Sequence, residues 1–186
     1  MISIIIPTFN EENSIERTLT ALITVEGEII VVDGGSQDRT IEIARGFDVR
    51  VIVSERGRGT QMNKGARLAR GSTLLFLHAD TIPPADVAAR IDEALIRDPD
   101  ILGGNCALHF DGDTGPARFM TWLYPKLEKL GLCYGDSGIF VRTRVYHEIG
   151  GFKPIPLFED VDFTRRLRKR GRFVRLPIEL VTSSRR

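Results

Sequence analysis

Cysteine is scarce in this chain of 186 residues, which contains only Cys106 and Cys133. Two cysteines in a chain of this length make no disulfide framework, so we expect buried free thiols in a reducing compartment. No apolar run approaches the ~20 residues that a membrane-spanning helix needs. Residues 1–6 also lack the basic and long apolar regions of a signal peptide. The sequence therefore predicts a cytoplasmic protein, and leaves open a contact with the inner face of the membrane.

An excess of charge of one sign is also missing, because 26 Lys and Arg residues face 25 Asp and Glu residues. With a net charge of +1 no global field draws in nucleic acid, which we do not expect as a partner. Basic residues do gather at positions 165–175. This stretch fits either a solvated helix face or a surface for anionic lipid, phosphates or an anionic acceptor.

A third absence concerns the loop after the first predicted strand. A dinucleotide-binding fold would place G-x-G-x-x-G there, whereas residues 7–12 read Pro-Thr-Phe-Asn-Glu-Glu. This disfavours NAD or FAD as a ligand. It also disfavours a sugar nucleotidyltransferase, for which we expect a glycine-rich loop bearing Lys or Arg at this position.

Short apolar runs alternate with helical patterns through about residue 98, which predicts an α/β fold with a mostly parallel sheet flanked by helices. The predicted strands in this part are residues 2–6, 29–32, 49–53 and 73–77. The rhythm then changes, with extended segments predicted at residues 101–110, 137–141 and 173–176. We interpret residues 1–186 as a single domain, with a nucleotide-sugar-binding half (1–100) and an acceptor-binding half (101–186).

Acidic residues follow the apolar runs at three places, namely Asp33, Asp80 and the pair Glu159-Asp160. In an open α/β sheet, ligands bind at the carboxyl ends of the strands. Acids at those ends can meet a nucleotide, a divalent cation and a nucleophilic hydroxyl. The pattern therefore favours a transferase that uses a sugar nucleotide.

The first predicted strand leads through Pro7 and Thr8, which we expect to contact the nucleotide, into a sharp turn and a helix start. Free N–H groups at a helix start favour an anion. Phe9 can stack on a base, and Glu11 can accept from a base N–H or a ribose hydroxyl. The alternative is that Asn10 caps the helix and the glutamates only complement its dipole.

Asp33 precedes two glycines, which allow close backbone approach, so its carboxylate can accept from the uracil imide or a ribose hydroxyl. It can also be an ordinary turn aspartate that binds its own backbone. Arg58 and Asn63 belong to a basic, amide-rich stretch that can cover the base or the phosphates. An ordinary loop and helix surface explains that stretch equally well.

Asp80 follows a strongly apolar strand, where a carboxylate is costly unless it is hydrogen-bonded or bound to metal. Hard cations such as Mg²⁺ and Mn²⁺ commonly bridge a protein carboxylate and a diphosphate, so Asp80 is the predicted metal ligand. His78 alternates with Asp80 and can ligate the metal or hydrogen-bond the ribose, although a lone histidine is more often structural.

Three acids stand together at positions 159, 160 and 162, at the start of a predicted helix. Asp160 is the predicted base that deprotonates a sugar hydroxyl. We expect Glu159, which we count as catalytic, and Asp162 to orient this base or bind the acceptor. Asp136 lies in a polar turn that can line the acceptor site. Favourable placement near the helix dipole competes with each of these roles.

The ordered set of motifs resembles glycosyltransferase family 2, the inverting GT-A transferases, over nearly the whole chain. The matching segments read P-T-F-N-E at 7–11, V-V-D-G-G-S-Q-D at 31–38, N-K-G-A-R-L-A-R-G at 63–71, L-H-A-D at 77–80 and E-D-V-D at 159–162. The L-H-A-D variant is most similar to a small bacterial subgroup of that family.

The resemblance implies a Rossmann-like GT-A fold, a nucleoside-diphosphate sugar bound with Mn²⁺ or Mg²⁺, and inversion at the anomeric carbon. Asp33 would hold the nucleoside and Asp80 the metal, and Asp160 would remove the proton of the acceptor hydroxyl. Two positions depart from the family pattern, since Gly34 replaces a second aspartate and His78 replaces the first acid of D-x-D. Relatives often continue further, so we expect a C-terminally shortened acceptor half.

The acceptor is not named by the sequence, and a glycan, a lipid or a small molecule all fit a hydroxyl nucleophile. A non-catalytic nucleotide-binding module is the remaining alternative. Such a module needs no base, so the pair Glu159-Asp160 distinguishes it from an enzyme.

Overall fold

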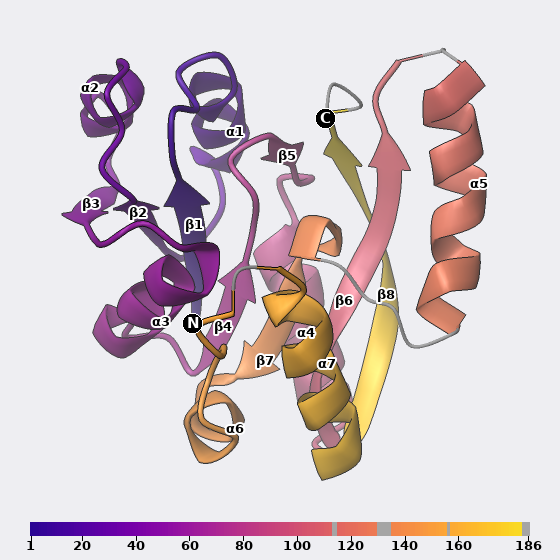
Figure 1. The fold of residues 1–186 in the computed structure, drawn as a ribbon. Coiled ribbons are helices and arrows are strands. Elements are labelled where there is room, and N and C mark those ends of the chain that lie inside the picture. Colours follow the sequence, from indigo (N-terminus) through magenta and orange to yellow (C-terminus); the bar gives the residue numbers. More distant parts are fainter. Residues whose placement is uncertain (113–114, 130–134, 156, 184–186) are drawn as a thin grey trace.

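A single sheet of eight strands, in the order β3-β2-β1-β4-β7-β6-β8-β5, organises the computed structural model. The structure describes residues 1–112, 115–129, 135–155 and 157–183. Helices cover both faces of the sheet, which gives three layers (Figure 1). The strands are β1 (Ile2–Thr8), β2 (Glu28–Asp33), β3 (Arg50–Val53), β4 (Thr73–Phe76), β5 (Thr81–Ile82), β6 (Ile101–Phe110), β7 (Ile139–Arg142) and β8 (Arg172–Thr182).

The helices connect these strands in the alternating order that the sequence predicts for its first half. They are α1 (Ile15–Leu22), α2 (Thr40–Arg45), α3 (Arg58–Leu68), α4 (Val87–Arg97), α5 (Gly115–Lys129), the 3₁₀ turn η1 (Gly135–Ser137), α6 (Thr143–Glu148) and α7 (Glu159–Arg170). None of the helices within the described ranges combines the length and the apolar character needed to cross a membrane.

Parallel pairing predominates, as predicted. β1 pairs parallel to β2 and β4, β2 to β3, and β6 to β8. β7 runs antiparallel between β4 and β6, and the two-residue β5 runs antiparallel to β8. Because parallel strands end at the same edge, Thr8 and Asp33 lie side by side in register there, and the end of β4 lies beside them. This edge positions the site described below.

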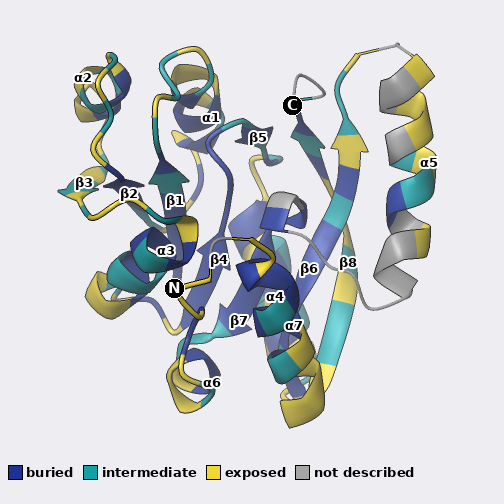
Figure 2. Cartoon of the chain, in the orientation of Figure 1, coloured by how far each residue is buried: buried dark blue, intermediate teal, exposed yellow. Residues whose placement is uncertain are grey.

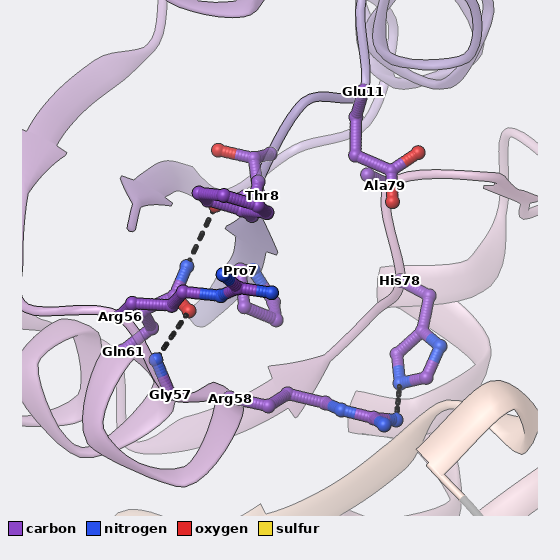
Figure 3. Close-up of a pocket in the computed structure, with 10 residues that line it drawn as sticks. Pro7, Thr8, Glu11, Arg56, Gly57, Arg58, Gln61, His78 and Ala79 are labelled. Atoms are coloured by element: carbon purple, nitrogen blue, oxygen red, sulfur yellow. Dashed lines mark hydrogen bonds between the residues drawn. The ribbon is translucent and has the colours of Figure 1, made fainter. Parts of the chain in front are cut away.

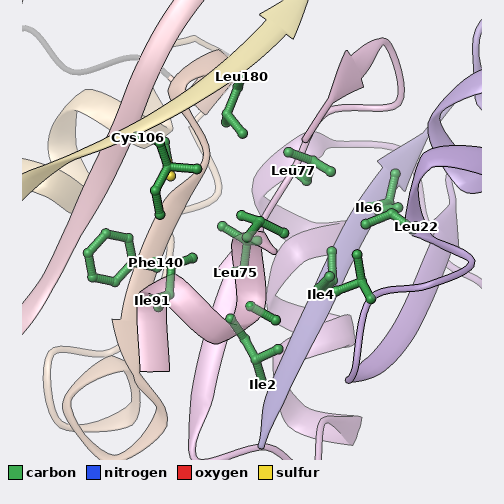
Figure 4. Close-up of a cluster of buried hydrophobic side chains, with 14 of the residues drawn as sticks. Ile2, Ile4, Ile6, Leu22, Leu75, Leu77, Ile91, Cys106, Phe140 and Leu180 are labelled. Atoms are coloured by element: carbon green, nitrogen blue, oxygen red, sulfur yellow. The ribbon is translucent and has the colours of Figure 1, made fainter. Parts of the chain in front are cut away.

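Alternation along β1 divides the core between the two faces of the sheet. Ile4 and Ile6 belong to one apolar cluster, with side chains from α1 and α4, and Ile5 belongs to the other, with side chains from α3, α6 and α7. Figure 4 shows the first cluster, where Ile4 and Ile6 lie near Leu22 and Leu75. Full burial of each such side chain stabilises the fold by roughly 1.5–3 kcal/mol. Figure 2 shows that the central strands are largely buried and that the helices carry both buried and exposed residues.

The segment after β1 differs from its prediction. Asn10 does not cap α1, which begins at Ile15; its backbone has φ 54°, and its Oδ1 accepts the Gln37 amide at 2.9 Å. Asparagine is among the residues that tolerate this left-handed conformation. The interpretation of Asn10 as a helix cap was therefore wrong, and its side chain instead joins two loops at the sheet edge.

The C-terminal part also differs from its prediction. β8 extends to Thr182, whereas the predicted strand ended at residue 176. Pro177 interrupts the strand pattern, and the register with β6 shifts there, between Cys106 and Ala107. The two-residue β5 was not predicted and pairs with the end of β8. Cys106 is a buried free thiol, as expected, and Cys133 lies outside the described residues.

Candidate active site

A cleft of about 460 Å³ opens at the carboxyl ends of β1 and β4 and beside the start of α3 (Figure 3). Its volume is within the usual range of small-molecule sites. Six predicted nucleotide-binding residues line it, whereas Asp33 and Asn63 do not. The full lining is Pro7, Thr8, Phe9, Glu11, Arg56, Gly57, Arg58, Gln61, His78 and Ala79.

The floor of the cleft is fixed by hydrogen bonds between two loops at the sheet edge. The Glu11 amide donates to Thr40 Oγ1 at 2.8 Å, and the Glu12 amide donates to Asp38 Oδ2 at 3.1 Å. Burial acts to raise the pKa of Asp38, but hydrogen bonds from Thr40 and Glu12 outweigh it and lower the pKa. Asp38 is therefore a charged anchor for this segment, which holds Glu11 at the cleft.

Asp33 is fully buried, and its carboxylate accepts four hydrogen bonds from its surroundings. The Gly35 and Ser36 amides donate to Oδ1, each at 2.8 Å, while Thr8 Oγ1 and Ser36 Oγ donate to Oδ2. This is the turn arrangement that the sequence left open as an alternative. Asp33 does not line the cleft but contacts Thr8, which does. Its contact with a nucleoside stays a prediction.

Four residues that line the cleft were not among the predicted site residues, namely Arg56, Gly57, Gln61 and Ala79. Gln61 Nε2 donates to the carbonyls of Thr8 and Val32 at 2.8 and 2.7 Å, which ties α3 to the ends of β1 and β2. A Cβ at Gly34 would lie 3.0 Å from Gln61 Oε1, so the glycine that departs from the family pattern makes room for this amide. The basic, amide-rich composition of residues 56–64 was the available signal.

Arg56 covers Phe9, the residue that the sequence predicts to stack on a base. The centre of the guanidinium lies 4.0 Å from the centroid of the ring, a cation–π distance. Both residues line the cleft. The Arg56 side chain therefore covers a face of the Phe9 ring on which a base could stack.

Arg58 connects the cleft with α7. Its Nη1 lies 3.3 Å from His78 Nε2, and its Nε lies 2.9 Å from Glu159 Oε1 (Figure 3 shows the contact with His78). Because a guanidinium only donates, His78 Nε2 is the acceptor in this contact. The Glu159 side chain is 2% exposed, so Arg58 supplies the charge that a buried carboxylate requires.

Asp160 lies beside this group at the start of α7 and is 5% exposed. Its Oδ2 accepts the Gly135 amide at 2.6 Å, and its Oδ1 accepts the Val161 amide at 2.7 Å. A Cβ at Gly135 would lie 2.8 Å from His78 Nε2 and 3.3 Å from Asp160 Oδ2. The glycine thus lets the imidazole and the carboxylate approach the same backbone position from two sides.

The turn before α7 has an unusual backbone. Phe158 has φ 63°, a region that a bulky aromatic residue rarely adopts, and its side chain is 60% exposed. The two residues that follow, Glu159 and Asp160, are both buried. This conformation turns the aromatic ring outward while the two acids face the protein interior.

Asp80 lines a second cleft of about 510 Å³ between α1, β5 and the ends of β6 and β8. Glu11 lines both clefts, and Ala79 of the first precedes Asp80 of the second, so the two clefts meet at these residues. Asp33, Asp80 and Asp160 therefore follow one edge of the sheet without lining a single cleft. Within the described ranges no three His, Cys, Asp or Glu side chains gather as a metal site.

Two predicted site residues make structural contacts. Asn63 Oδ1 accepts Tyr146 Oη at 2.5 Å and the Phe152 amide at 3.0 Å, and its Nδ2 donates to the Phe152 carbonyl. Asp162 pairs with Lys153 at 3.1 Å and Arg166 at 2.7 Å. Burial acts to raise the pKa of Asp162, but hydrogen bonds from these cations outweigh it and lower the pKa.

Asp136 belongs to η1, next to the glycine that binds Asp160, and the position of its side chain lies outside the described part of the chain. Its acceptor-binding role stays a prediction. The role of Asp162 in acceptor binding also stays a prediction. The contacts of Asn63 favour a structural role over the predicted contact with the nucleotide, which no observation tests directly.

Comparison with known families gives one match over most of the chain. Residues 3–151 match the family described as "Glycosyl transferase family 2". A relative from Haloferax volcanii, "Glycosyltransferase AglE", is 28% identical over 190 residues, which cover 91% of this chain and 62% of the relative. The "Dolichol-phosphate mannosyltransferase" of Pyrococcus furiosus is 33% identical over 56% of this chain and 32% of its own length. The chain thus spans less than two thirds of these relatives.

Solved structures share the fold at low sequence identity. S. aureus TarS 1–349 in complex with UDP-GlcNAc superposes with a TM-score of 0.78 at 19% identity, over 100% of this chain and 59% of that one. The mannosyltransferase PcManGT from Pyrobaculum calidifontis, in complex with GDP-Man and Mn²⁺, gives a TM-score of 0.77 at 23% identity, over 97% and 56%. The likeness confirms the predicted GT-A type of α/β fold.

Proposed function

Since the chain belongs to glycosyltransferase family 2, we propose that it transfers a sugar from a nucleoside-diphosphate sugar to an acceptor hydroxyl, with inversion and with help from a divalent cation. The observation that supports this most is the arrangement around Arg58. This residue lines the cleft at the sheet edge and also pairs with Glu159, next to the buried Asp160. A donor site and a candidate base are thus neighbours.

The nucleoside binds in the first cleft. The base stacks on a face of the Phe9 ring and displaces the Arg56 guanidinium that covers it in the structure. Glu11 and the Thr8 region supply acceptors for the N–H and hydroxyl groups of a nucleoside. Asp33 and Gln61 keep these elements in place through their hydrogen bonds to Thr8. The donors in the complexes named above carry UDP or GDP, so both bases are candidates.

The diphosphate lies toward Arg58 and Asp80. A guanidinium offers N–H donors in a geometry that suits phosphate oxygens. Asp80 is an oxygen ligand of the kind that Mn²⁺ and Mg²⁺ prefer, and such cations usually complete their coordination with substrate phosphates and water. When bound, the cation neutralises charge on the departing diphosphate. His78 Nε2 faces Arg58 rather than Asp80's cleft, so we propose that His78 serves the donor and not the metal.

Asp160 acts as the base. Its carboxylate is buried but keeps two backbone N–H donors, which fix its orientation. A positioned and partly desolvated carboxylate can accept the proton of a sugar hydroxyl as the hydroxyl attacks. The oxygen of the acceptor forms the new bond to the anomeric carbon, and the diphosphate leaves from the opposite face. A single displacement of this kind inverts the anomeric configuration.

The acceptor hydroxyl belongs to a glycan, a lipid or a small molecule. If the protein also touches a membrane, we place that contact on α5, where Phe119 and Trp122 are 56% and 58% exposed. Lys126 Nζ lies 3.0 Å from the centroid of the Trp122 ring. Exposed aromatics beside basic residues suit the interfacial region of an anionic membrane.

Calorimetric titration with UDP-, GDP-, dTDP- and CMP-sugars, with Mn²⁺ and with EDTA, tests the donor site. We expect one nucleotide class to bind, and its affinity to fall about tenfold or more when the metal is removed, a change of ~1.4 kcal/mol or more. Asp80→Ala should remove the gain from Mn²⁺. Equal affinity in Mn²⁺ and in EDTA would contradict the metal-assisted donor site.

A further inference from the structure

The burial of Glu159 needs an explanation beyond the helix dipole. Its side chain is 2% exposed, and a buried carboxylate is stable only when it is paired. Among the described side chains its ion-pair partner is Arg58, at 2.9 Å, whereas the neighbouring Asp160 is satisfied by two backbone amides. Removal or misplacement of Arg58 would therefore affect Glu159 directly and Asp160 much less.

Arg58 makes two side-chain contacts in the site. Its Nε lies 2.9 Å from Glu159 Oε1, an ion pair without hydrogen-bond geometry, and its Nη1 lies 3.3 Å from His78 Nε2. A guanidinium carries five N–H donors in total. The side chain is 39% exposed and lines the cleft, so the donors of Nη2 remain for a ligand in the cleft. An arginine that is already paired with a buried carboxylate loses less side-chain freedom when it binds such a ligand.

We propose that Glu159 is a positioning residue for the donor, which holds Arg58 so that the guanidinium meets the diphosphate. This inference rests on the proposed function, because the diphosphate of the donor is the ligand. It differs from the expectation that Glu159 orients the base Asp160 or binds the acceptor. The carboxylate works at the donor side of the site, through Arg58.

The direction in which nucleotide affinity changes when Glu159 is neutralised distinguishes a positioning role from simple charge repulsion. A carboxylate near a diphosphate repels it, so removal of the Glu159 charge alone would strengthen nucleotide binding. Loss of positioning has the opposite effect, because Arg58 would then have to be ordered by the ligand itself. Glu159→Gln keeps the size of the side chain and therefore tests these two effects against each other.

A double-mutant cycle on Arg58→Gln and Glu159→Gln, with UDP and GDP as calorimetric probes in the presence of Mn²⁺, is the test. We expect Glu159→Gln to weaken binding of the nucleotide about tenfold (~1.4 kcal/mol). In the Arg58→Gln background the same substitution should change affinity less than about twofold. Arg58→Lys keeps the charge without the fork and should not restore the dependence on Glu159. Glu42→Gln, which removes the exposed partner of Arg39, is the matched control and should leave affinity unchanged.

The outcomes separate this inference from the proposed function. If the wild-type protein binds neither UDP nor GDP, the proposed function fails and this inference fails with it. If it binds one of them, but Glu159→Gln strengthens binding or the two substitutions act additively, the proposed function stands and the positioning role is wrong. Thermal unfolding of each variant, measured without nucleotide, checks that the compared proteins are folded.

Discussion

Replacement of Asn63 by alanine should destabilise the fold rather than weaken nucleotide binding. The Asn63 amide makes three hydrogen bonds, to Tyr146 Oη and to both backbone groups of Phe152. Tyr146 and Phe152 are 3% and 2% exposed, so the substitution leaves buried polar groups without partners. Each such group costs about 1–3 kcal/mol, and because water can reach part of the half-buried site we expect a total loss of roughly 2–4 kcal/mol.

Urea denaturation of wild type and Asn63→Ala, followed by linear extrapolation to water, measures this loss. Gln37→Ala, at an exposed position on another loop, is the control and should change the free energy of unfolding by no more than ~0.5 kcal/mol. Nucleotide affinity, measured where both proteins are folded, should stay within about twofold, a change of less than ~0.5 kcal/mol. A loss of stability below ~1 kcal/mol together with tenfold weaker nucleotide binding would refute the structural role.

Three further predictions concern the α7 region. Asp160→Asn should lower transfer at least about 10²-fold, as expected for a lost general base, while nucleotide affinity stays nearly intact; turnover at the wild-type rate would exclude Asp160 as the base. Gly135→Ala should weaken nucleotide binding, because the added Cβ would lie 2.8 Å from His78 Nε2, and an unchanged calorimetric affinity would contradict this. Folding lowers the pKa of Asp162, so its ionised carboxylate stabilises the fold at any pH above about 4, the pKa of an aspartate in the unfolded chain. This contribution is lost as pH falls through the lowered pKa of the folded protein. Asp162→Asn should therefore flatten the acid side of a stability profile, and parallel profiles would argue against it.

The α/β architecture could be predicted because its evidence is local. The apolar run at residues 2–6 and those that follow it read as buried strands, and the alternation with helical patterns predicted parallel pairing. The edge at which Thr8 and Asp33 meet followed from that topology. By contrast, β5 is too short to leave a pattern, and Pro177 interrupts the pattern of β8.

The cleft was predicted in part for the same reason. Pro7 and Thr8 end β1 and Phe9 follows it directly, so the strand itself fixed their place at the sheet edge. Asn63 shared the same composition signal as Arg58, yet the turn of α3 points it toward Phe152 instead of the cleft. Residue type and spacing do not show which face of an unusually polar helix is buried, and α3 has few apolar positions to reveal it.

The acids of α7 show most clearly what a sequence leaves undetermined. Glu159 and Asp160 both suit a helix start, where the dipole favours carboxylates. Their positions in the sequence therefore do not distinguish their roles. Their partners come from elsewhere in the chain: an arginine that opens α3 for one, and a backbone amide in η1 for the other. Two adjacent carboxylates thereby acquire different environments, one compensated by a guanidinium at the donor cleft and one by backbone amides. That difference, which only tertiary structure creates, is the physical basis for giving them different tasks.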